Sequence, residues 1–467
     1  MEAMSIREIL EAVDGALLGG DDDLELSIDR VETDSRTIHP GSLFVPIIGE
    51  QFDGHAYINA ALEGGAAACF TARERENYLP GKVYIKVKDT RRALRLLGRH
   101  YRQKFSIPVV AVAGSVGKTT TKDMIAAVLG ERYKVLKTEG NLNTDIGVCA
   151  TLFRLDRSYE AAVLEMGINH PGEMGPISAI AQPDVVCITN IGDSHIEAFG
   201  CRENTMKAKL EIFDHAVPGC TAILNGDGAL LRSAEEDIER RWTGSVIYVG
   251  RGEDLDYRAG ELESDWRSRV SCDVTTPRGT CRMDIPALGE HMIYPTLMAA
   301  AVGERFGMTL EEITAGVRNF APTKMRMNIL PRQENITILN DAYNANPQSM
   351  RAAVEVLANS GADYKLAVLG DMFELGPLAP ALHASIGEHL GKAGIDCLVA
   401  VGELAKNIAD AASAGLVPEV YHCADKEEAK PLLAKLLRPN TTVLVKASRG
   451  MAFEELVDYL KDLTKEA

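Results

Sequence analysis

The stretch "VVAVAGSVGKTTTKDM" (109–124) decides how the middle of this chain folds. It opens with small apolar residues typical of a buried strand, and beyond Lys118 its apolar residues recur at helical spacing. The turn between the two ends in Gly117, Lys118 and Thr119. A glycine-rich turn that leads from a strand into a helix N-terminus suits phosphate, because backbone N–H groups and the helix dipole both favour an anion there. The stretch therefore predicts a nucleotide site.

The spacing of the glycines in this loop departs from the common phosphate-loop pattern. G-x-x-x-x-G-K-[ST] would require a glycine at Val112, but the nearest one is Gly114, so the loop reads G-x-x-G-K-T. Lys118 is suited to neutralise phosphate oxygens, and the hydroxyl of Thr119 is suited to bind Mg2+. We expect the nucleotide to contact a continuous part of the loop, namely Ala113, Gly114, Ser115, Val116, Gly117, Lys118, Thr119 and Thr120.

Length and charge limit the classes of protein to which this chain can belong. The chain has 467 residues, enough for three domains of roughly 150 residues each. Its formal net charge of -17 argues against a general nucleic-acid binder, which needs a broad basic face. With no secretory signal and no run approaching the roughly 20 apolar residues of a membrane span, we expect a cytoplasmic protein without membrane insertion. Nine cysteines without a C-x-x-C motif predict reduced thiols.

The apolar runs predict an α/β protein of three domains. Residues 1–106 form a small α/β domain in this interpretation, residues 107–320 a central P-loop ATPase-like domain with a parallel sheet, and residues 321–467 a Rossmann-like domain. In the last two, continuous apolar strands are typical of parallel sheets covered on both faces. The segment 245–286 breaks this rhythm and predicts an antiparallel excursion beside the central sheet.

Polar residues follow several central strands, at the sheet edge where such folds bind ligands. Glu165 ends one strand, where its carboxylate could complete a magnesium site opposite Thr119. His195 follows the next strand, although a single histidine is more often structural than a metal ligand. Lys207 and Lys209 lie two positions apart on a predicted helix, so at most one of them faces the site.

The third domain offers a second set of polar strand ends. Asp341 closes one strand, Asn344 and Asn346 lie in the loop that follows, and Lys446 ends a later strand. Arg326 lies in the connection between the second and third domains, where a hinge could bring it onto a phosphate. We therefore expect two rims that face each other across a cleft, and a domain closure that brings Arg326 to the phosphate loop.

A series of motifs resembles, in order, the Mur ligase family of peptidoglycan precursor synthesis across essentially the whole chain. The motifs are "AGSVGKTTTKDM", "EGNLNTDIGV", "LEMGINHPGE", "TNIGDSHIEAFG", "KAKLEIF", "LNDAYNANPQSM", "VLGDMFELG" and "LVKASRG". The resemblance implies an ATP-dependent amide ligase that works with Mg2+ in cell wall biogenesis, and we expect the protein to be a monomer. It implies UDP-N-acetylmuramoyl-tripeptide and D-alanyl-D-alanine as partners, joined through an acyl phosphate. The short phosphate loop is the form that amide ligases of this kind carry.

The same resemblance implies roles for individual residues. Thr119 and Glu165 correspond to Mg2+ ligands, and His195 to a ligand of a second Mg2+. Lys209 corresponds to a carbamylated lysine that supports the second metal. The implied catalytic residues are Lys118, Glu165, His195, Lys209 and Arg326. The implied ATP contacts beyond the loop are Asn190, His291, Arg326 at a phosphate and Asp341 at the ribose. The candidate substrate contacts are Ser35, Arg36, Asp53, Gly54 and His55 for the uridine nucleotide, Asn141, Asn143 and Thr144 for the muramoyl peptide, and Asn344, Asn346 and Lys446 in the third domain.

One segment departs from the family, and other functions fit part of the pattern. Met292 and Pro295 stand where many relatives carry asparagines, so backbone groups beside His291 are expected to hold adenine. The alternatives are a related ligase that adds an amino acid to a muramoyl peptide or to a folate, a small-molecule kinase, and a non-enzymatic ATP-dependent scaffold. A folate ligase would lack such an N-terminal domain, a kinase would leave the amine-binding domain unused, and the acidic metal site disfavours a scaffold.

Overall fold

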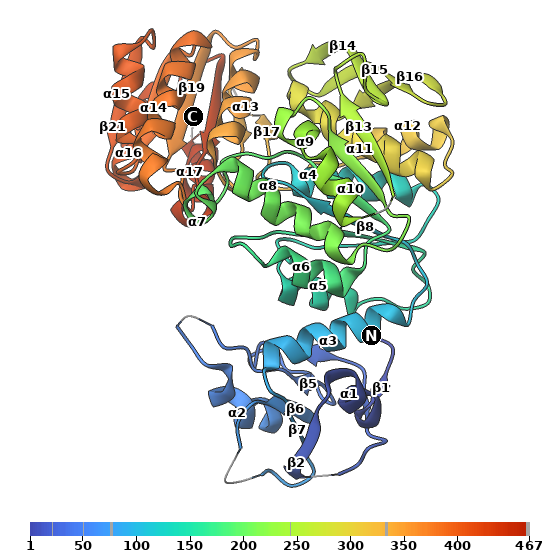
Figure 1. Ribbon diagram of the computed structural model, residues 1–467. Coiled ribbons are helices and arrows are strands. Elements are labelled where there is room, and N and C mark those ends of the chain that lie inside the picture. Colours follow the sequence, from blue (N-terminus) through green and yellow to red (C-terminus); the bar gives the residue numbers. More distant parts are fainter. Residues whose placement is uncertain (21, 50, 75–77, 243, 332–334, 464–467) are drawn as a thin grey trace.

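The structure, a computed structural model, describes residues 1–20, 22–49, 51–74, 78–242, 244–331 and 335–463. Three units follow one another along the chain, and the central unit lies between the other two (Figure 1). We call them the N-terminal unit (4–103), the central unit (109–318) and the C-terminal unit (328–463) after the elements they contain. The domain limits expected from the sequence stay predictions. Within the described ranges, no helix combines the length and the apolar character that a membrane crossing needs.

The N-terminal unit is built from short strands and amphipathic helices. Its main elements are β1 (Met4–Ser5), α1 (Ile6–Val13), β2 (Ala16–Gly20), β3 (Ser27–Ile28), β4 (Val31–Glu32), β5 (Leu43–Phe44), α2 (Ile58–Glu63), β6 (Ala68–Thr71), β7 (Val83–Lys86) and α3 (Thr90–Gln103). The main sheet has the order β2-β7-β6-β5-β4, and β2 is antiparallel to β7 while the other pairs are parallel.

Helix α3 joins the N-terminal unit to the central unit. Its periodic apolar residues Ala93, Leu94 and Leu97 are buried, and the helix packs on α5 (Asp145–Leu152) and α6 (Met174–Ala181) of the central unit. One continuous apolar core therefore extends through both units. Figure 1 shows α3 between the N-terminal sheet and this helix pair.

An ion pair between Arg91 and Asp145 fixes the same junction. Both hydrogen bonds from the guanidinium to the Asp145 carboxylate measure 2.7 Å, and only 6% of the Asp145 side chain is exposed. Replacing Arg91 by methionine should lower the free energy of unfolding in urea by about 1 kcal/mol, because a buried carboxylate then loses two hydrogen bonds and keeps only Arg95, at 3.9 Å, as a cationic partner. Arg92→Met makes the same change at an exposed neighbour and should leave stability unchanged. Equal losses in the two variants would contradict this interpretation.

The central unit holds a nine-stranded sheet. Its elements are β8 (Val109–Ala113), α4 (Lys118–Gly130), β9 (Val135–Lys137), α5, β10 (Ala161–Glu165), α6, β11 (Val185–Ile188), α7 (Ile196–Phe199), α8 (Arg202–Leu210), β12 (Thr221–Asn225), α9 (Ala229–Ser233), α10 (Glu235–Arg241), β13 (Ser245–Gly250), β14 (Tyr257–Asp265), β15 (Arg269–Thr276), β16 (Gly279–Ile285), α11 (Ile293–Arg305) and α12 (Leu310–Arg318). The strand order is β16-β15-β14-β13-β12-β11-β8-β10-β9. Successive side chains of β8 enter two different cores, one on each face, because side chains alternate along a strand.

The antiparallel excursion is shorter than the sequence predicts. β13 pairs in parallel with both β12 and β14, so the prediction was wrong for its residues, and the antiparallel pairs of this segment are β14 with β15 and β15 with β16. The buried half of β13 continues the apolar pattern of the parallel strands, which is why it joins them. Helices α11 and α12 pack on α4, and the three helices cover the face of the central sheet to which Val110 and Val112 of β8 point.

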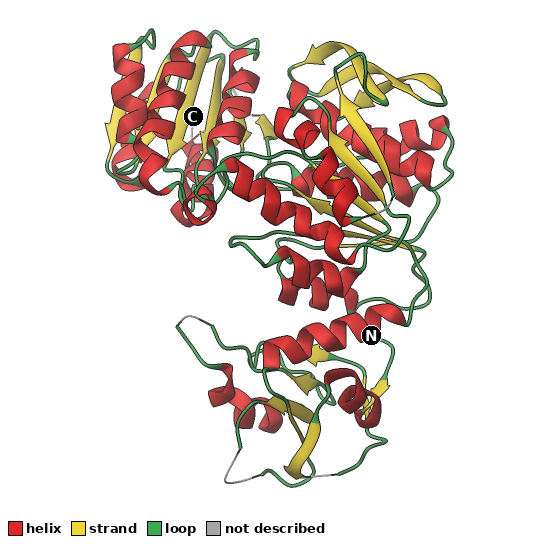
Figure 2. Ribbon diagram, viewed as in Figure 1, coloured by secondary structure: helices red, strands yellow, loops and turns green. Residues whose placement is uncertain are grey.

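The C-terminal unit is a second sheet covered on both faces (Figure 2). Its elements are β17 (Asn328–Pro331), β18 (Thr337–Asn340), α13 (Pro347–Ala358), β19 (Tyr364–Gly370), α14 (Ala379–Lys392), β20 (Cys397–Val401), α15 (Lys406–Ala414), β21 (Glu419–Cys423), α16 (Lys426–Leu436), β22 (Thr441–Lys446) and α17 (Glu454–Leu463). The order is β17-β18-β22-β19-β20-β21, with antiparallel pairing between β17 and β18 and parallel pairing elsewhere.

Direct contacts hold the C-terminal unit against the central unit. Ile196 on α7 and Leu288, before α11, belong to the same buried cluster as Leu369 of the C-terminal sheet. The backbone N–H of Glu197 donates to the carbonyl of Glu374 at 3.2 Å. The strand ends of the two sheets therefore face each other at short range.

Candidate active site

The main cleft lies between the central and C-terminal units and has a volume of about 1060 Å³. The phosphate loop and the loops after β10 and β11 form one wall, and the loops after β18 and β22 form the opposite wall. Because parallel strands bring their carboxyl ends to one edge of a sheet, both sheets present polar residues here. The two rims expected from the sequence thus enclose one space.

The loop between β8 and α4 has the shape of an anion site. Gly117 caps α4 at a φ of 84°, and a Cβ at this position would meet no atom within 4 Å, so the space in front of the helix is open. Gly114 has a φ of 140°, and a Cβ there would collide with the hydroxyl of Thr189. Lys118 donates from Nζ to the Gly114 carbonyl at 3.0 Å. Both glycines are therefore required by geometry.

Asn190 supports the phosphate loop from the neighbouring strand. Its Oδ1 accepts from the Val116 N–H and its Nδ2 donates to the Val116 carbonyl, both at 3.0 Å. Its own carbonyl accepts from the N–H of Ser115 at 3.0 Å. Asn190 was expected to contact ATP; in this structure its polar atoms hold the loop that faces the cleft.

Thr119, Glu165 and Asn143 converge behind the loop. The hydroxyl of Thr119 donates to Oε2 of Glu165 at 2.8 Å, and Nδ2 of Asn143 donates to Oε1 at 2.8 Å. Glu165 is buried at the end of β10, as its place after an apolar strand predicts. Asn143, expected to line the peptide path, therefore also orients the carboxylate, while Asn141 lines the cleft and Thr144 caps α5.

Arg326 reaches this cluster from the connection between the central and C-terminal units. Its Nη2 donates to the hydroxyl of Thr119 at 2.9 Å, and its guanidinium lies 4.3 Å from the ring centroid of Tyr343. Met325 and Met327 on either side adopt left-handed conformations, with φ values of 59° and 53°. The Nε atom of Arg326 is buried and has no hydrogen-bond partner among the described residues. A buried donor without an acceptor, stacked on an aromatic ring, is arranged for an anionic ligand.

Two lysines near the loop carry lowered pKa values. Burial lowers the pKa of Lys209 to about 7, and the charge of Lys118 adds to the shift. Desolvation in the cleft also lowers the pKa of Lys118, despite the attraction of Glu165. Lys209 is 2% exposed whereas Lys207 is exposed, so only one of this pair faces inward, as predicted.

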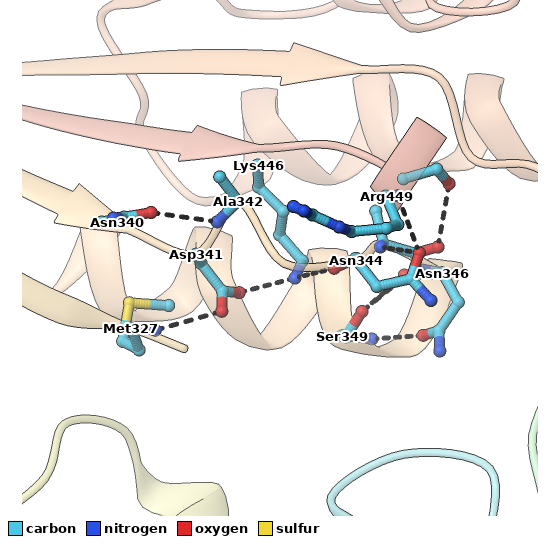
Figure 3. A network of polar contacts seen from close by, with 11 residues as sticks. Met327, Asn340, Asp341, Ala342, Asn344, Asn346, Ser349, Lys446 and Arg449 are labelled. Carbon is cyan, nitrogen blue, oxygen red and sulfur yellow. Dashed lines mark hydrogen bonds and ion pairs between the residues drawn. The ribbon is translucent and has the colours of Figure 1, made fainter. Parts of the chain in front are cut away.

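The C-terminal wall is a network of hydrogen bonds around Asp341 (Figure 3). Its carboxylate accepts from Nζ of Lys446 at 2.6 Å and from the N–H of Met327 at 3.1 Å. Lys446 also donates to the carbonyl of Asn344 at 2.8 Å. Asn346 caps α13, because its Oδ1 accepts from the N–H of Ser349 while the hydroxyl of Ser349 accepts from the N–H of Asn346. Its Nδ2 donates to the hydroxyl of Ser194 in the central unit. The expected ribose contact at Asp341 stays a prediction, since the carboxylate here binds the connection between the central and C-terminal units through Met327.

His195 bridges the two units instead of joining a preformed metal cage. Its Nδ1 lies 2.7 Å from Oε2 of Glu374, which belongs to the loop after β19. Both residues have left-handed backbones, with φ values of 57° and 62°. In the part of the chain that the structure describes, no group of three or more His, Cys, Asp or Glu residues gathers in the manner of a metal site.

The residues expected near adenine line the cleft. They are His291, Met292 and Pro295, around the start of α11, and their contact with adenine stays a prediction. Tyr294 donates its hydroxyl to Oδ2 of Asp227 at 3.0 Å. Asp227 is a further lining residue that the sequence did not single out.

The candidate uridine residues lie in the N-terminal unit and do not line this cleft. Arg36 is exposed and pairs with Asp34, next to Ser35. Buried His55 has both ring nitrogens engaged, Nδ1 with Asp53 at 2.8 Å and Nε2 with the N–H of Ala72 at 3.1 Å. A Cβ on Gly54, between these two residues, would meet the backbone of Pro46 and Ile47. Their substrate role stays a prediction.

Sequence patterns of one enzyme family match three parts of this chain. The pattern described as "Mur ligase family, catalytic domain" matches residues 27–102, that of the "Mur ligase middle domain" residues 112–303, and that of the "Mur ligase, glutamate ligase domain" residues 325–449. The chain therefore belongs to the Mur ligase family, and the resemblance predicted from its motifs is confirmed.

Comparison with three known proteins shows how far this similarity extends. The UDP-N-acetylmuramoyl-tripeptide--D-alanyl-D-alanine ligase of Bacillus subtilis is 36% identical over 461 residues, which cover 98% of each chain. The crystal structure of MurF from Acinetobacter baumannii superimposes with a TM-score of 0.92 at 31% identity, over 100% of this chain and 99% of that one. MurF ligase from Thermotoga maritima in complex with ADP gives a TM-score of 0.83 at 26% identity, over 94% and 98% of the chains. The predicted α/β architecture is thus confirmed.

Proposed function

We propose that this chain joins D-alanyl-D-alanine to UDP-N-acetylmuramoyl-tripeptide in an ATP-dependent amide ligation of peptidoglycan synthesis. The observation that carries the proposal is the contact of Arg326 with Thr119 of the phosphate loop, inside one cleft. The similar protein of Bacillus subtilis is named for this reaction. An enzyme of this kind forms a carbon–nitrogen bond at the expense of ATP.

The chemistry requires a carboxylate to become an electrophile. A carboxylate oxygen of the tripeptide attacks the γ-phosphorus of ATP, ADP leaves, and an acyl phosphate forms. The amine of D-alanyl-D-alanine then attacks the acyl carbon, and the tetrahedral intermediate expels inorganic phosphate as the nitrogen loses its proton. Negative charge develops on the phosphoryl group and then on the acyl oxygen, so cationic donors are needed at both stages.

The cleft fits a nucleoside triphosphate at its centre. The open space before Gly117 and the N-terminus of α4 suit phosphate oxygens, and Lys118 lies beside them. The unpartnered Nε of Arg326 fits an oxygen of the terminal phosphate. Lys118 and Arg326 would therefore stabilise the phosphoryl group from two sides during its transfer.

Mg2+ is proposed as the metal of this site. Thr119 and Glu165 would hold it, because a hydroxyl and a carboxylate 2.8 Å apart are oxygen ligands that suit Mg2+ together with phosphate and water. Bound there, Mg2+ would neutralise charge on the phosphates. His195 and Lys209 would support a second ion, with Nδ1 of His195 held by Glu374 and Nε2 left for the metal.

We propose that Lys209 is carbamylated, and its environment supports this modification. A buried ammonium is costly, and its pKa of about 7 leaves a large neutral fraction at neutral pH. The neutral amine reacts with CO2 and becomes an anion, which suits a place beside Lys118 and a metal. Because the pKa is lowered, the neutral amine increases as the pH rises through about 7.

This modification predicts a spectroscopic signal. In bicarbonate labelled with carbon-13, the protein should show a carbamate carbon resonance by nuclear magnetic resonance. The signal should strengthen as the pH rises from about one unit below the pKa of about 7 to about one unit above it. The resonance should be absent from Lys209→Gln and present in Lys207→Gln, the exposed neighbour. A signal that persists in Lys209→Gln would contradict the assignment.

The remaining candidates complete the substrate path. Ser35, Arg36 and the segment 53–55 are proposed to hold the uridine nucleotide, and residues 141–144 to guide the peptide. Asn344, Asn346 and Lys446 are proposed to shape the site of the incoming dipeptide. A monomer suffices because one chain forms both walls of the cleft. We propose a cytoplasmic location, which the use of ATP and of a nucleotide-linked substrate supports.

One assay tests the proposed function. Phosphate release from ATP is measured with UDP-N-acetylmuramoyl-tripeptide and D-alanyl-D-alanine added singly and together, and the product is analysed by mass spectrometry. The ligase requires both substrates and yields a new amide. Phosphorylation of an alcohol acceptor without amide formation would instead identify a small-molecule kinase.

A further inference from the structure

Residues 319–327 connect the central unit to the C-terminal unit and carry Arg326, and we call them the linker. The linker contacts helix α4 at a second point, three residues before Arg326. The hydroxyl of Thr323 donates to Oδ2 of Asp123 at 2.6 Å. Asp123 lies on α4, four residues after Thr119, so the two residues share one face of the helix. The linker therefore lies along this face with one contact to each residue, Thr323 to Asp123 and Arg326 to Thr119.

Asp123 is a fixed point. It is 8% exposed, and its Oδ1 lies 2.8 Å from Nζ of Lys137 and 3.1 Å from Nζ of Lys122. Lys122 also donates to the carbonyl of Thr138 at 2.8 Å. Burial opposes ionisation of Asp123, yet the hydrogen bonds from Lys137 and Thr323 and the charge of Lys122 hold its pKa below the ordinary value. Within the steps proposed above, this carboxylate has no chemical task.

The segment from Thr323 to Arg326 has little freedom to compensate for a lost anchor. The N–H of Arg326 donates to the carbonyl of Thr323 at 3.3 Å, and left-handed Met325 lies between them. The N–H of Tyr343, whose ring supports the guanidinium, donates to the carbonyl of Met325 at 3.2 Å. A displacement of Thr323 is thus transmitted to the guanidinium.

We propose that Asp123 and Thr323 are positioning residues that dock the interdomain linker on α4 and thereby set the approach of Arg326 to the phosphate. The inference rests on the proposed function, because it assumes that Arg326 acts on the transferred phosphoryl group. It explains why a buried carboxylate faces a linker hydroxyl so close to the phosphate loop. A misplacement of about 1 Å at a catalytic group can cost up to a hundredfold in rate.

The test removes one hydroxyl and keeps the shape of the side chain. Thr323→Val is expected to lower kcat about tenfold with the KM for ATP unchanged, and to lower the melting temperature only slightly because Asp123 keeps Lys122 and Lys137. Thr323→Ser restores the hydroxyl and should recover most of the turnover. Thr280→Val makes the same change on the exposed hairpin of β15 and β16, and its kcat should equal that of the unchanged protein. A wild-type kcat in Thr323→Val, or a raised KM for ATP as its sole effect, overturns the proposal.

A double-mutant cycle with Arg326→Lys separates positioning from a general structural role. If Thr323 acts through Arg326, Thr323→Val should cost less than about twofold in the Arg326→Lys background, because the geometry it protects is already lost. Independent effects that multiply would overturn the proposal.

Small-angle scattering provides a readout that does not depend on amide formation. With ADP bound, the unchanged protein should give one compact profile and Thr323→Val a more extended one, since the linker loses an anchor. Identical profiles together with identical kcat values overturn the positioning role. Failure of the proposed function is a different result: the unchanged protein would then make no amide, whatever the scattering shows.

Discussion

Replacement of Lys118 by methionine should reduce kcat for amide formation about a thousandfold, a loss near 4 kcal/mol of transition-state stabilisation. Lys118 lies at the first position of α4 beside the open space before Gly117, and no other lysine occupies the loop. Methionine keeps the length and the apolar contacts of the side chain but removes its charge. Steady-state kinetics with saturating ATP and both substrates measures the loss.

A matched lysine on the surface provides the control for this variant. Lys207→Met makes the same chemical change at an exposed position of α8 and should retain the full kcat. The melting temperature of Lys118→Met should not fall, because desolvation already disfavours the charged form there. A kcat within about tenfold of the unchanged protein would show that Lys118 does not stabilise the transferred phosphoryl group.

The second large effect is expected at Glu165. Glu165→Gln should lower kcat by about two to three orders of magnitude and raise the Mg2+ concentration needed for half-maximal activity at least about tenfold. Glutamine still accepts a hydrogen bond from the Thr119 hydroxyl through its one carbonyl oxygen, so this contact survives, while the negative charge and the oxygen that accepts from Asn143 are lost. Magnesium titrations at fixed ATP measure both quantities.

The comparison for Glu165 is an exposed carboxylate of the same unit. Glu261→Gln on β14 removes one negative charge far from the loop and should change neither kcat nor the magnesium requirement. A Glu165→Gln variant with reduced kcat but an unchanged magnesium requirement would assign the carboxylate a role other than holding the metal. That result would also leave Thr119 without its proposed partner at the ion.

Most of the fold could be predicted because its determinants are local. Parallel strands such as β8 and β10 are continuous apolar runs, and a helix start after Gly117 is marked by the loop itself. β13 was misassigned because its outer half is only partly buried, so its pattern resembles an edge strand. The shared core at α3 could not be predicted, since an amphipathic helix does not specify which unit it will cover.

The candidate site likewise contains residues that the sequence could reveal and residues that it could not. Lys118, Thr119 and Glu165 could be found because each occupies a local motif or the end of an apolar strand. Thr323 and Asp123 are 200 residues apart, and no pattern in a single sequence pairs a linker hydroxyl with a helix carboxylate. The same holds for Glu374, whose contact with His195 depends on how two sheets face each other.

Carboxylate activation by phosphoryl transfer is the central claim, and an isotope experiment tests it most directly. UDP-N-acetylmuramoyl-tripeptide labelled with oxygen-18 in its free carboxylate is incubated with ATP, Mg2+ and D-alanyl-D-alanine, and the products are analysed by mass spectrometry. An acyl phosphate transfers one labelled oxygen to the inorganic phosphate, because the bond to phosphorus outlasts the bond to the acyl carbon. Unlabelled phosphate accompanied by label in AMP, or in water alone, would contradict this account of the cleft.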